Sequence, residues 1–374
     1  MRVVIVGGGV IGLATAWAAA RRGHGVELFE QGPLPNPLSA SVDQHRLTRI
    51  PYGDQRGYTR LMAAAFRAWD VVWSALGESH YAETGFLSLS TEENDWTDRS
   101  RATLAALALP HEIVARDGLA ERFPMLRVDD ARYGLYARQA GVLFADRIVD
   151  GFLTLLRDSG VRLHDNARVA AVDASSATVT LAGGRSVGAD AVVIAGGVHT
   201  GALAPWLSRK PVPLRQIVAY VAPPPTLAEA WATAPIMMDL GGPRGMFLAP
   251  PVAGRSMKLG CGALNHPSDP VPFVPARDGE GLRVMSMYER RLARFEEFTL
   301  LQGGCCYYAN TGDQRFIAER SGRALAFTGC SGHAFKFAAL LGFGLADALD
   351  RGETALEWMT GDDRAYDAGL LQRA

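Results

Sequence analysis

The sequence predicts an α/β fold: a Rossmann-type domain of parallel strands and helices, interleaved with an α+β domain built on an antiparallel sheet. Three observations predict it. A β-branched apolar run at residues 2–6 leads into a glycine-rich turn and a helix-forming stretch. A second buried strand, ending in small residues, lies far along the chain at 189–197. Between 205 and 320 the pattern changes to short strands and proline-rich loops, which is typical of an antiparallel sheet.

Length and composition indicate an ordinary globular enzyme with two domains, or with one large domain and an insertion. The 374 residues are 48% hydrophobic and 21% charged, with a formal net charge of −1. This balance gives no reason to expect a nucleic acid or an anionic membrane as a partner. No apolar run is long enough to span a bilayer. The glycines at 7–9 argue against a signal peptide at 3–20.

The four cysteines show no metal-binding or disulfide spacing. Cys261, Cys305, Cys306 and Cys330 contain no C-x-x-C pair, and adjacent cysteines are a poor framework for a disulfide or a zinc site. We therefore expect no metal and a reducing, cytoplasmic compartment.

The first thirty residues form a dinucleotide-binding unit. A strand at 2–6 precedes Gly7, Gly9 and Gly12, a helix is expected over 13–22, and a second strand at 26–29 ends at Glu30. The first glycine permits a tight turn, the second lets the backbone approach a pyrophosphate, and the third lets the helix pack on the strand. The acid can accept hydrogen bonds from ribose hydroxyls. These residues predict an adenine dinucleotide and leave open which one.

The remaining elements follow in order. We expect a helix over 59–76, a strand at 85–89 and a helix at 95–108, while residues 39–53 show neither helical nor strand period. A helix reaching residue 157 and strands at 160–164 and 167–173 precede a hairpin around Gly183 and Gly184. An amphipathic helix is expected over 282–298, with a charged, solvated face. A strand at 324–329 leads through a glycine turn into a helix at 338–349.

This pattern predicts two discontinuous domains. The nucleotide-binding domain takes residues 1–80, 141–204 and 321–374, and the substrate domain takes 81–140 and 205–320.

Four later stretches, in order along the chain, resemble the D-amino-acid-oxidase-like superfamily of FAD enzymes, and within it the monomeric sarcosine oxidase group. The first is HRLTR at 45–49 followed by YG at 52–53, and the second is MKLG at 257–260. The third is CYY at 306–308 with Thr311, Asp313 and FI at 316–317, and the fourth is SGHAFKF at 331–337. The resemblance implies that the dinucleotide is FAD and that the substrate is a small amine.

The resemblance also implies residue roles. Arg49 and Lys336 match the pair that binds a substrate carboxylate, and Lys258 matches the lysine that activates O2. Cys306 matches the cysteine that bonds covalently to the flavin, although neighbouring Cys305 competes for that position. Tyr308 matches an active-site aromatic residue. Further cofactor contacts are implied at Arg46, Val169, Gly196, Gly332 and His333.

Each of these matches has a simpler alternative. A surface salt bridge would account for either Arg49 or Lys336, and a buried inert thiol would account for Cys306. The chain also departs from the group at Val42 and Asp43, and at Phe247, where those enzymes carry a tyrosine near the substrate amine. These departures concern the substrate more than the reaction class.

The sequence thus predicts a monomeric FAD-dependent oxidase. It would remove a hydride from the C–N bond of a secondary, N-methyl or cyclic amino acid, giving an imine while O2 is reduced to hydrogen peroxide. One competing interpretation is a dehydrogenase of the same fold that passes electrons to a carrier. Others are a flavin-binding protein without turnover and an NAD-dependent dehydrogenase.

Overall fold

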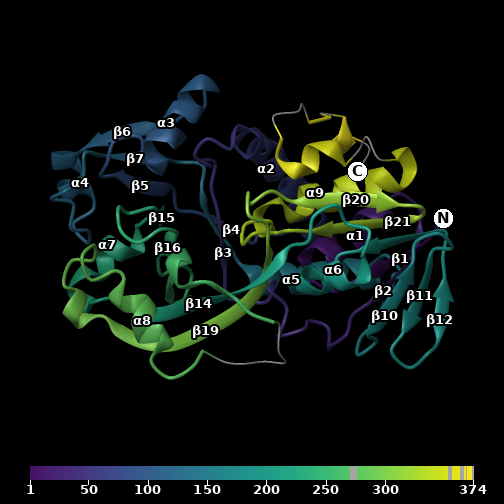
Figure 1. Ribbon diagram of the computed structural model, residues 1–374. Coiled ribbons are helices and arrows are strands. Elements are labelled where there is room, and N and C mark those ends of the chain that lie inside the picture. The colour runs from purple at the N-terminus through teal and green to yellow at the C-terminus, as the bar shows by residue number, and fades with distance from the viewer. Residues whose placement is uncertain (270–275, 353–355, 363–365, 368, 373–374) are drawn as a thin grey trace.

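The computed structural model of the chain describes residues 1–269, 276–352, 356–362, 366–367 and 369–372. Parts of the predicted segments 205–320 and 321–374 lie outside these residues. Figure 1 shows two bodies side by side, with the chain passing repeatedly between them and both termini on the same body.

The first body is a six-stranded sheet in the order β20-β21-β13-β1-β2-β9. All neighbouring pairs are parallel except the antiparallel edge strand β20. The strands are β1 (Arg2–Val6), β2 (Gly25–Phe29), β9 (Arg162–His164), β13 (Ala191–Ile194), β20 (Ile317–Ser321) and β21 (Ala324–Thr328). The sheet therefore collects segments that are far apart in the sequence, as the Rossmann-type prediction requires.

Both faces of this sheet are covered. Alternate residues of β1 point to opposite sides of the sheet, and both sets are buried. Val3 and Ile5 join the core beneath the helices, whereas Val4 and Val6 pack against a small antiparallel sheet. That small sheet consists of β10 (Val169–Asp173), β11 (Thr178–Leu181) and β12 (Ser186–Gly188), and the predicted hairpin is confirmed at its β11–β12 turn.

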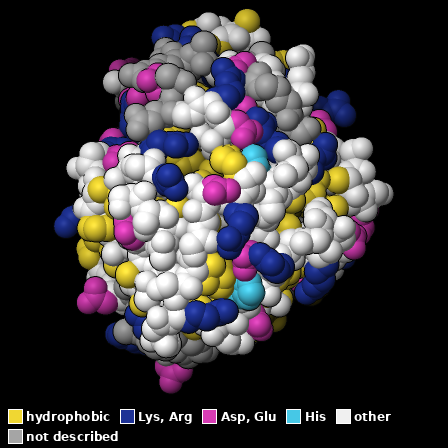
Figure 2. Space-filling model, turned by 90° about the vertical axis from the view of Figure 1, so that its right-hand side faces the viewer, with side chains coloured by type: hydrophobic (Ala, Val, Ile, Leu, Met, Phe, Trp, Pro, Cys, Tyr) yellow, Lys and Arg dark blue, Asp and Glu magenta, His cyan; other side chains and the backbone are white. Residues whose placement is uncertain are grey.

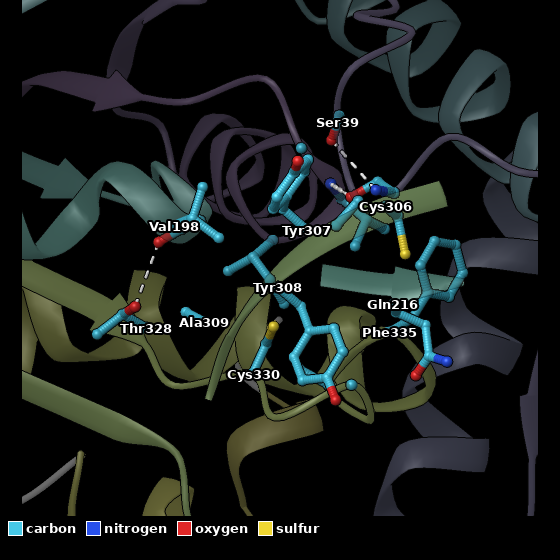
Figure 3. A pocket seen from close by; sticks show the side chains of 18 of the residues that line it. Ser39, Val198, Gln216, Cys306, Tyr307, Tyr308, Ala309, Thr328, Cys330 and Phe335 are labelled. Atoms are coloured by element: carbon cyan, nitrogen blue, oxygen red, sulfur yellow. Dashed lines mark hydrogen bonds between the residues drawn. The ribbon is translucent and has the colours of Figure 1, made fainter. Parts of the chain in front are cut away.

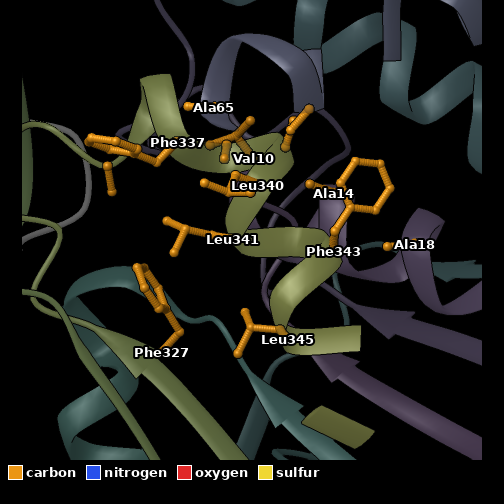
Figure 4. Close-up of a cluster of buried hydrophobic side chains, with 14 of the residues drawn as sticks. Val10, Ala14, Ala18, Ala65, Phe327, Phe337, Leu340, Leu341, Phe343 and Leu345 are labelled. Atoms are coloured by element: carbon orange, nitrogen blue, oxygen red, sulfur yellow. The ribbon is translucent and has the colours of Figure 1, made fainter. Parts of the chain in front are cut away.

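The helical layer consists of α1 (Val10–Arg21), α2 (Arg56–Leu76), α5 (Ala145–Asp158) and α9 (Ala338–Arg351), with the short α6 (Thr200–Leu203) nearby. Figure 4 shows the apolar side chains of α9 packed with those of α1 and with Phe327 of β21. The two helices approach closely, since a Cβ atom on Gly342 would lie 2.7 Å from the backbone of Ala14. This packing fixes the N-terminal end of α1 relative to the C-terminal segment.

The second body is built on a nine-stranded sheet in the order β18-β14-β17-β16-β15-β5-β7-β6, with β19 paired to β14. All its pairs are antiparallel except β5 with β15. Its strands are β5 (Phe86–Ser90), β6 (Glu112–Ala115), β7 (Tyr133–Ala137), β14 (Val212–Ala222), β15 (Ile236–Met238), β16 (Met246–Ala249), β17 (Met257–Cys261), β18 (His266–Pro267) and β19 (Thr299–Asn310). Its helices are α3 (Trp96–Ala106), α4 (Arg116–Arg122), α7 (Ala228–Ala232) and α8 (Glu280–Ser286).

A third antiparallel sheet joins the two bodies. It contains β3 (Arg46–Thr48), β8 (Gly141–Leu143) and β4 (Tyr81–Glu83), with β8 in the middle. The strand β3 lies in the stretch 39–53, for which we expected no strand, because three residues are too few to show a period. The division of the chain into two domains stays a prediction, and these strands pair across its boundaries at 80/81 and 140/141.

The predicted long helix over 282–298 is wrong. Helix α8 ends at Ser286, and turns follow, with Arg294 in the left-handed conformation. The expected solvated face is also wrong at Arg291. Its side chain is buried, forms an ion pair with Asp130 and donates a 2.7 Å hydrogen bond to the carbonyl of Gly241. Arg291 therefore contributes a buried contact between distant segments of the chain rather than a solvated helix face.

The described part of the chain contains no helix that is both long and apolar enough to cross a membrane. On the face shown in Figure 2, acidic and basic side chains are interspersed, as expected for a chain of net charge −1.

Candidate active site

One large cavity, with a volume of about 1130 Å³, lies between the two bodies. It extends from the C-terminal ends of β1, β2 and β13 to one face of the nine-stranded sheet. Ligands of open parallel sheets bind beyond the carboxyl ends of their strands, so the position agrees with the predicted dinucleotide site. Figure 3 shows side chains from several distant segments directed into this space.

The glycine-rich turn forms one end of the cavity, and its geometry explains two of its glycines. Gly7 has a φ of +110°, and a Cβ atom there would lie 2.4 Å from the carbonyl oxygen of Ala195. A Cβ atom on Gly12 would lie 1.9 Å from the carbonyl oxygen of Gly7. Gly9 is the N-cap of α1 and carries no side chain that would block the helix terminus. The N-terminus of α1 therefore borders the cavity at Gly9, Val10 and Ile11, and a helix N-terminus is a suitable site for a pyrophosphate.

The predicted acid lies at the same end. Glu30 is buried, and its carboxylate accepts hydrogen bonds from the backbone N–H groups of Gly8 and Gly32, at 2.7 and 3.0 Å, and from the side chain of Asn36, at 2.8 Å. These donors fix the carboxylate beside the turn. Val169 and Gly196 also line this part of the cavity. The contact of Glu30 with ribose hydroxyls stays a prediction.

The other end of the cavity is lined by residues of neighbouring antiparallel strands, and along β14 the lining residues alternate as Leu214, Gln216 and Val218. Gln216 of β14 is the Cα partner of Cys306 in β19, and Tyr220 of β14 is the Cα partner of Lys258 in β17. Directly opposed residues project from the same face of a sheet. The register of the strand pairs therefore places Gln216, Cys306 and Lys258 together on the wall of the cavity.

The same alternation distinguishes the two adjacent cysteines. Cys306 lines the cavity, and Figure 3 shows its sulfur beside Gln216 and Phe335. Cys305 does not line the cavity. Burial raises the pKa of its thiol, and the nearby charge of Arg215 opposes that rise. Burial raises the pKa of Cys306 to about 11, an effect that the nearby guanidinium of Arg46 opposes. Of the two adjacent cysteines, Cys306 is therefore the one that lines the cavity, where Cys330 also lies, and a bond of Cys306 to a flavin stays a prediction.

Lys258 is buried, and its ammonium group has two partners. Its Nζ atom donates to the carbonyl of His45 at 2.7 Å and to the carboxylate of Asp43 at 3.0 Å. Burial lowers the pKa of Lys258, while Asp43 acts in the opposite direction. The lysine predicted to activate O2 thus carries an acidic partner, at a position where the sequence departs from the sarcosine oxidase group.

Arg46 belongs to the same cluster. Its guanidinium forms an ion pair with Asp43 and donates to the carbonyl of Ala40 at 2.6 Å. The imidazole of His45, for which we predicted no role, is fully buried, with Nε2 3.2 Å from the carbonyl oxygen of Ser256. Burial lowers its pKa to about 3, so this ring is neutral.

Arg49 lies at the substrate end, and it is not part of a surface salt bridge. Its side chain is buried, with the guanidinium carbon 4.0 Å from the ring centre of Tyr52 and 5.4 Å from that of Trp96. Its nitrogens face the sulfur of Met238 and the carbonyl of Pro51. Among the described residues no carboxylate pairs with it, and burial lowers its pKa.

Lys336 lies against the same tyrosine. Its Nζ atom is 5.7 Å from the ring centre of Tyr52 and donates to the carbonyl of His333 at 3.1 Å. No acidic side chain of the described residues pairs with it. Burial, and then the charge of Arg49, hold the pKa of Lys336 well below its ordinary value. Two basic side chains therefore share a buried space without an acidic partner among the described residues, and charging both of them there is unfavourable.

The remaining predicted residues of the glycine turn are structural neighbours of this pair. Gly332 has a φ of +73°, and a Cβ atom there would lie 3.5 Å from the ring of Tyr308. The His333 ring packs among Tyr52, Tyr58, Phe316 and Phe337. Its Nε2 atom lies 2.9 Å from the carbonyl oxygen of Gln314, and burial keeps its pKa far below the ordinary value.

Several cavity residues escaped the sequence analysis. The side-chain amide of Asn265 donates to the amide oxygen of Gln216 and to the hydroxyl of Tyr308, both at 2.8 Å. Ser41 accepts a hydrogen bond from the first helical N–H of α1, at Val10, at 2.9 Å. Single amides and serines carry no motif, so only their positions in the fold could identify them. Among the described residues, no group of three or more His, Cys, Asp or Glu side chains could hold a metal ion.

Comparison with known proteins agrees with this geometry. The sequence profile of a family described as FAD dependent oxidoreductase matches residues 2–348. The chain is 25% identical over 355 residues to N-methyl-L-tryptophan oxidase of Salmonella dublin, covering 92% of this chain and 93% of that protein. The corresponding enzyme of Yersinia pestis is 23% identical over 352 residues, covering 91% and 92%.

Solved structures share the fold. L-proline dehydrogenase from P. horikoshii superposes with a TM-score of 0.81 at 18% identity, covering 96% of this chain and 95% of that one. NikD, described as an unusual amino acid oxidase essential for nikkomycin biosynthesis, gives a TM-score of 0.76 at 21% identity, covering 99% and 96%. At this level of identity the likeness shows the fold alone.

Proposed function

The chain belongs to the FAD dependent oxidoreductase family, and we propose that it oxidises a secondary, N-methyl or cyclic amino acid. In this reaction the C–N unit loses a hydride from carbon and a proton from nitrogen, giving an imine. O2 gains two electrons and two protons, giving hydrogen peroxide. FAD supplies the two-electron chemistry when bound.

The observation that carries the proposal is the buried cation pair. Arg49 and Lys336 lie against one tyrosine ring without an acidic partner in the described residues. A substrate carboxylate would neutralise both cations, and a planar guanidinium can bind it through two parallel hydrogen bonds. The alternative of a surface salt bridge fails, since both side chains are buried. The pair therefore favours amines that carry a carboxylate.

The neighbouring side chains suit the rest of such a molecule. Phe247, Met238 and Tyr308 line the cavity and offer apolar surface to the carbon skeleton of a substrate. Lys258 would stabilise negative charge that develops as O2 is reduced. We propose that Cys306, which lines the cavity, holds FAD covalently. We propose that a single chain forms the complete site, so that the enzyme acts as a monomer.

A dehydrogenase that passes electrons to a carrier is the second candidate. It is favoured by one contact, because Lys258 is not a free cation but pairs with Asp43. Both candidates share the oxidation of the amine and differ only in the electron acceptor.

A substrate panel tests the proposal. Purified protein should be yellow, and N-methyl and cyclic amino acids should bleach the bound flavin in the absence of O2 and release peroxide in its presence. Bleaching followed by slow reoxidation in air would select the dehydrogenase. Failure of the whole panel to bleach the flavin would overturn the proposed function.

A further inference from the structure

Asp43 lies in the segment between β2 and β3, and four donors surround its carboxylate. One oxygen accepts from Lys258 at 3.0 Å and from the guanidinium of Arg46. The other accepts from the hydroxyl of Tyr220 and from the backbone N–H of Gln44, the latter at 2.6 Å. The carboxylate is therefore fully hydrogen-bonded, and its side chain is only 12% exposed.

The donors to this carboxylate come from parts of the chain that are far apart in the sequence. Tyr220 and Lys258 are Cα partners on adjacent antiparallel strands, so both side chains project from the cavity face of the sheet. Arg46 belongs to β3, in the sheet that joins the two bodies. The carboxylate thus ties the loop carrying the predicted site residues to the wall of the nine-stranded sheet.

We propose that Asp43 is a positioning residue that keeps Lys258 protonated and fixed on the cavity wall, so that the lysine can act as a cation during O2 reduction. This inference rests on the proposed function through the role of Lys258. It concerns a residue at which the sequence differs from the sarcosine oxidase group, and it assigns a purpose to that difference.

The charges around Lys258 support this assignment. The charged and titratable groups facing it are Asp43, His45 and Arg46 from the segment at β3, Tyr220 from β14, and Cys306 from β19. Burial and Arg46 both favour the neutral amine, and His45 is itself neutral. Asp43 favours the ammonium form through both its charge and its hydrogen bond, and its effect is larger than that of Cys306, which acts in the same direction. Although burial opposes it, the pKa of Asp43 lies far below its ordinary value because of Arg46 and Lys258.

Removing the carboxylate charge should destabilise the protonated form of Lys258. An opposite charge within about 4–6 Å shifts a pKa by roughly 1–3 units. In Asp43→Asn the pKa of Lys258 should therefore fall by about one unit or more. Lys258 would then lose its proton at a lower pH than in the wild type, and the cavity would lose one positive charge.

The test is a pH titration of the absorption spectrum of substrate-free holoenzyme, which responds to charge beside the flavin without any turnover. The wild type should show an alkaline spectral transition that is absent in Lys258→Met, which assigns the transition to this lysine. Asp43→Asn should move the midpoint to lower pH by about one unit or more. An unchanged midpoint would overturn the inference.

Two further variants serve as a fallback and as a matched control. Asp43→Ser removes the same negative charge with a smaller polar side chain and should also move the midpoint to lower pH, which preserves the test if Asp43→Asn does not fold. Asp98→Asn is the matched control, because Asp98 also pairs with an arginine, Arg132, and accepts from a tyrosine, Tyr133, but on α3. It should leave the midpoint unchanged, and a shift there would contradict a local role for Asp43.

Reoxidation by O2, measured on the same variants, separates this inference from the proposed function. If Lys258→Met reoxidises as fast as the wild type while Asp43→Asn still moves the spectral midpoint, the role of Asp43 stands and the role of Lys258 in O2 reduction fails. If Lys258→Met slows reoxidation and Asp43→Asn leaves the midpoint in place, the proposed function stands and the inference fails.

Discussion

The two ends of the cavity are built in different ways. At the Rossmann end, Gly7 and Gly12 shape a turn that leads into the N-terminus of α1, and Glu30 is held by two of the chain's own backbone N–H groups. At the sheet end, the chemistry lies in buried charged side chains, namely Arg49, Lys258 and Lys336. Backbone groups can hold a phosphate without burying a charge, whereas buried cations need an anion.

The sheet end itself contains a second contrast. Lys258 pairs with Asp43, so its charge is balanced within the protein. Arg49 and Lys336 have no such partner among the described residues, and the pKa of each is lowered by burial. This difference supports the proposal that Arg49 and Lys336 bind a substrate carboxylate, whereas the charge of Lys258 is balanced without a ligand.

The largest expected effect is at the Rossmann end. Gly12→Ala would place a Cβ atom 1.9 Å from the carbonyl oxygen of Gly7, and backbone cannot move aside easily. We expect a loss of about 1–3 kcal/mol of unfolding free energy, or more, together with most of the bound flavin. Thermal unfolding and flavin absorbance measure both. Gly183→Ala is the control, since no neighbour lies within 4 Å, and a stable, fully yellow Gly12→Ala protein would contradict this account of the turn.

The next effect concerns the two adjacent cysteines. Cys306→Ser should abolish covalent attachment, so that acid-precipitated protein loses its colour. Cys305→Ser should keep the attachment, because Cys306 lines the cavity and Cys305 does not. The same precipitation on wild-type protein is the reference. Colour retained by Cys306→Ser and lost by Cys305→Ser would reverse the assignment, and a colourless wild-type precipitate would exclude a covalent bond.

A smaller effect is expected at the unpaired cations. Arg49→Ala should weaken the binding of carboxylate ligands by about 1.5–3 kcal/mol, the value of a hydrogen bond to a charged group. This corresponds to roughly 10- to 150-fold in Kd, measured by titrating the flavin spectrum. The matching carboxamide serves as the control and should lose little affinity. Equal losses for both ligands would show that the arginine does not recognise the carboxylate.

The smallest effect is a pH dependence. Because burial and Arg49 hold the pKa of Lys336 well below its ordinary value, the free lysine readily loses its proton, and a bound carboxylate favours the charged form. Ligand binding should then take up a proton, and affinity should fall as pH rises, by up to about tenfold per pH unit. Lys336→Met should remove this slope. A slope that survives in the variant would assign the proton to another group.

The Rossmann end could be predicted from the sequence, because glycine spacing and strand pattern are local signals. Gly7, Gly9, Gly12 and Glu30 all lie where the motif implied. The site residues at the sheet end could be predicted only through a family resemblance, since Arg49, Lys258 and Lys336 are far apart in the sequence. The strand register and the C-terminal turn bring them to one cavity.

Other features could not be predicted in this way. The helical spacing at 282–298 gave no sign that Arg291 would be drawn inward by Asp130, because that partner lies on a distant segment. Asp43 was noted only as a departure from the sarcosine oxidase group, and its contact with Lys258 spans 215 residues of sequence. Long-range ion pairs of this kind leave no local pattern.

The central claim is that the unpaired cations Arg49 and Lys336 select amines bearing a carboxylate. The most direct test compares anaerobic bleaching of the bound flavin by N-methyl and cyclic amino acids with bleaching by the same amines lacking the carboxylate. We predict that the amino acids bleach the flavin and the simple amines do so far more slowly at equal concentration. Equal rates for both sets, or bleaching by the simple amines alone, would contradict the claim.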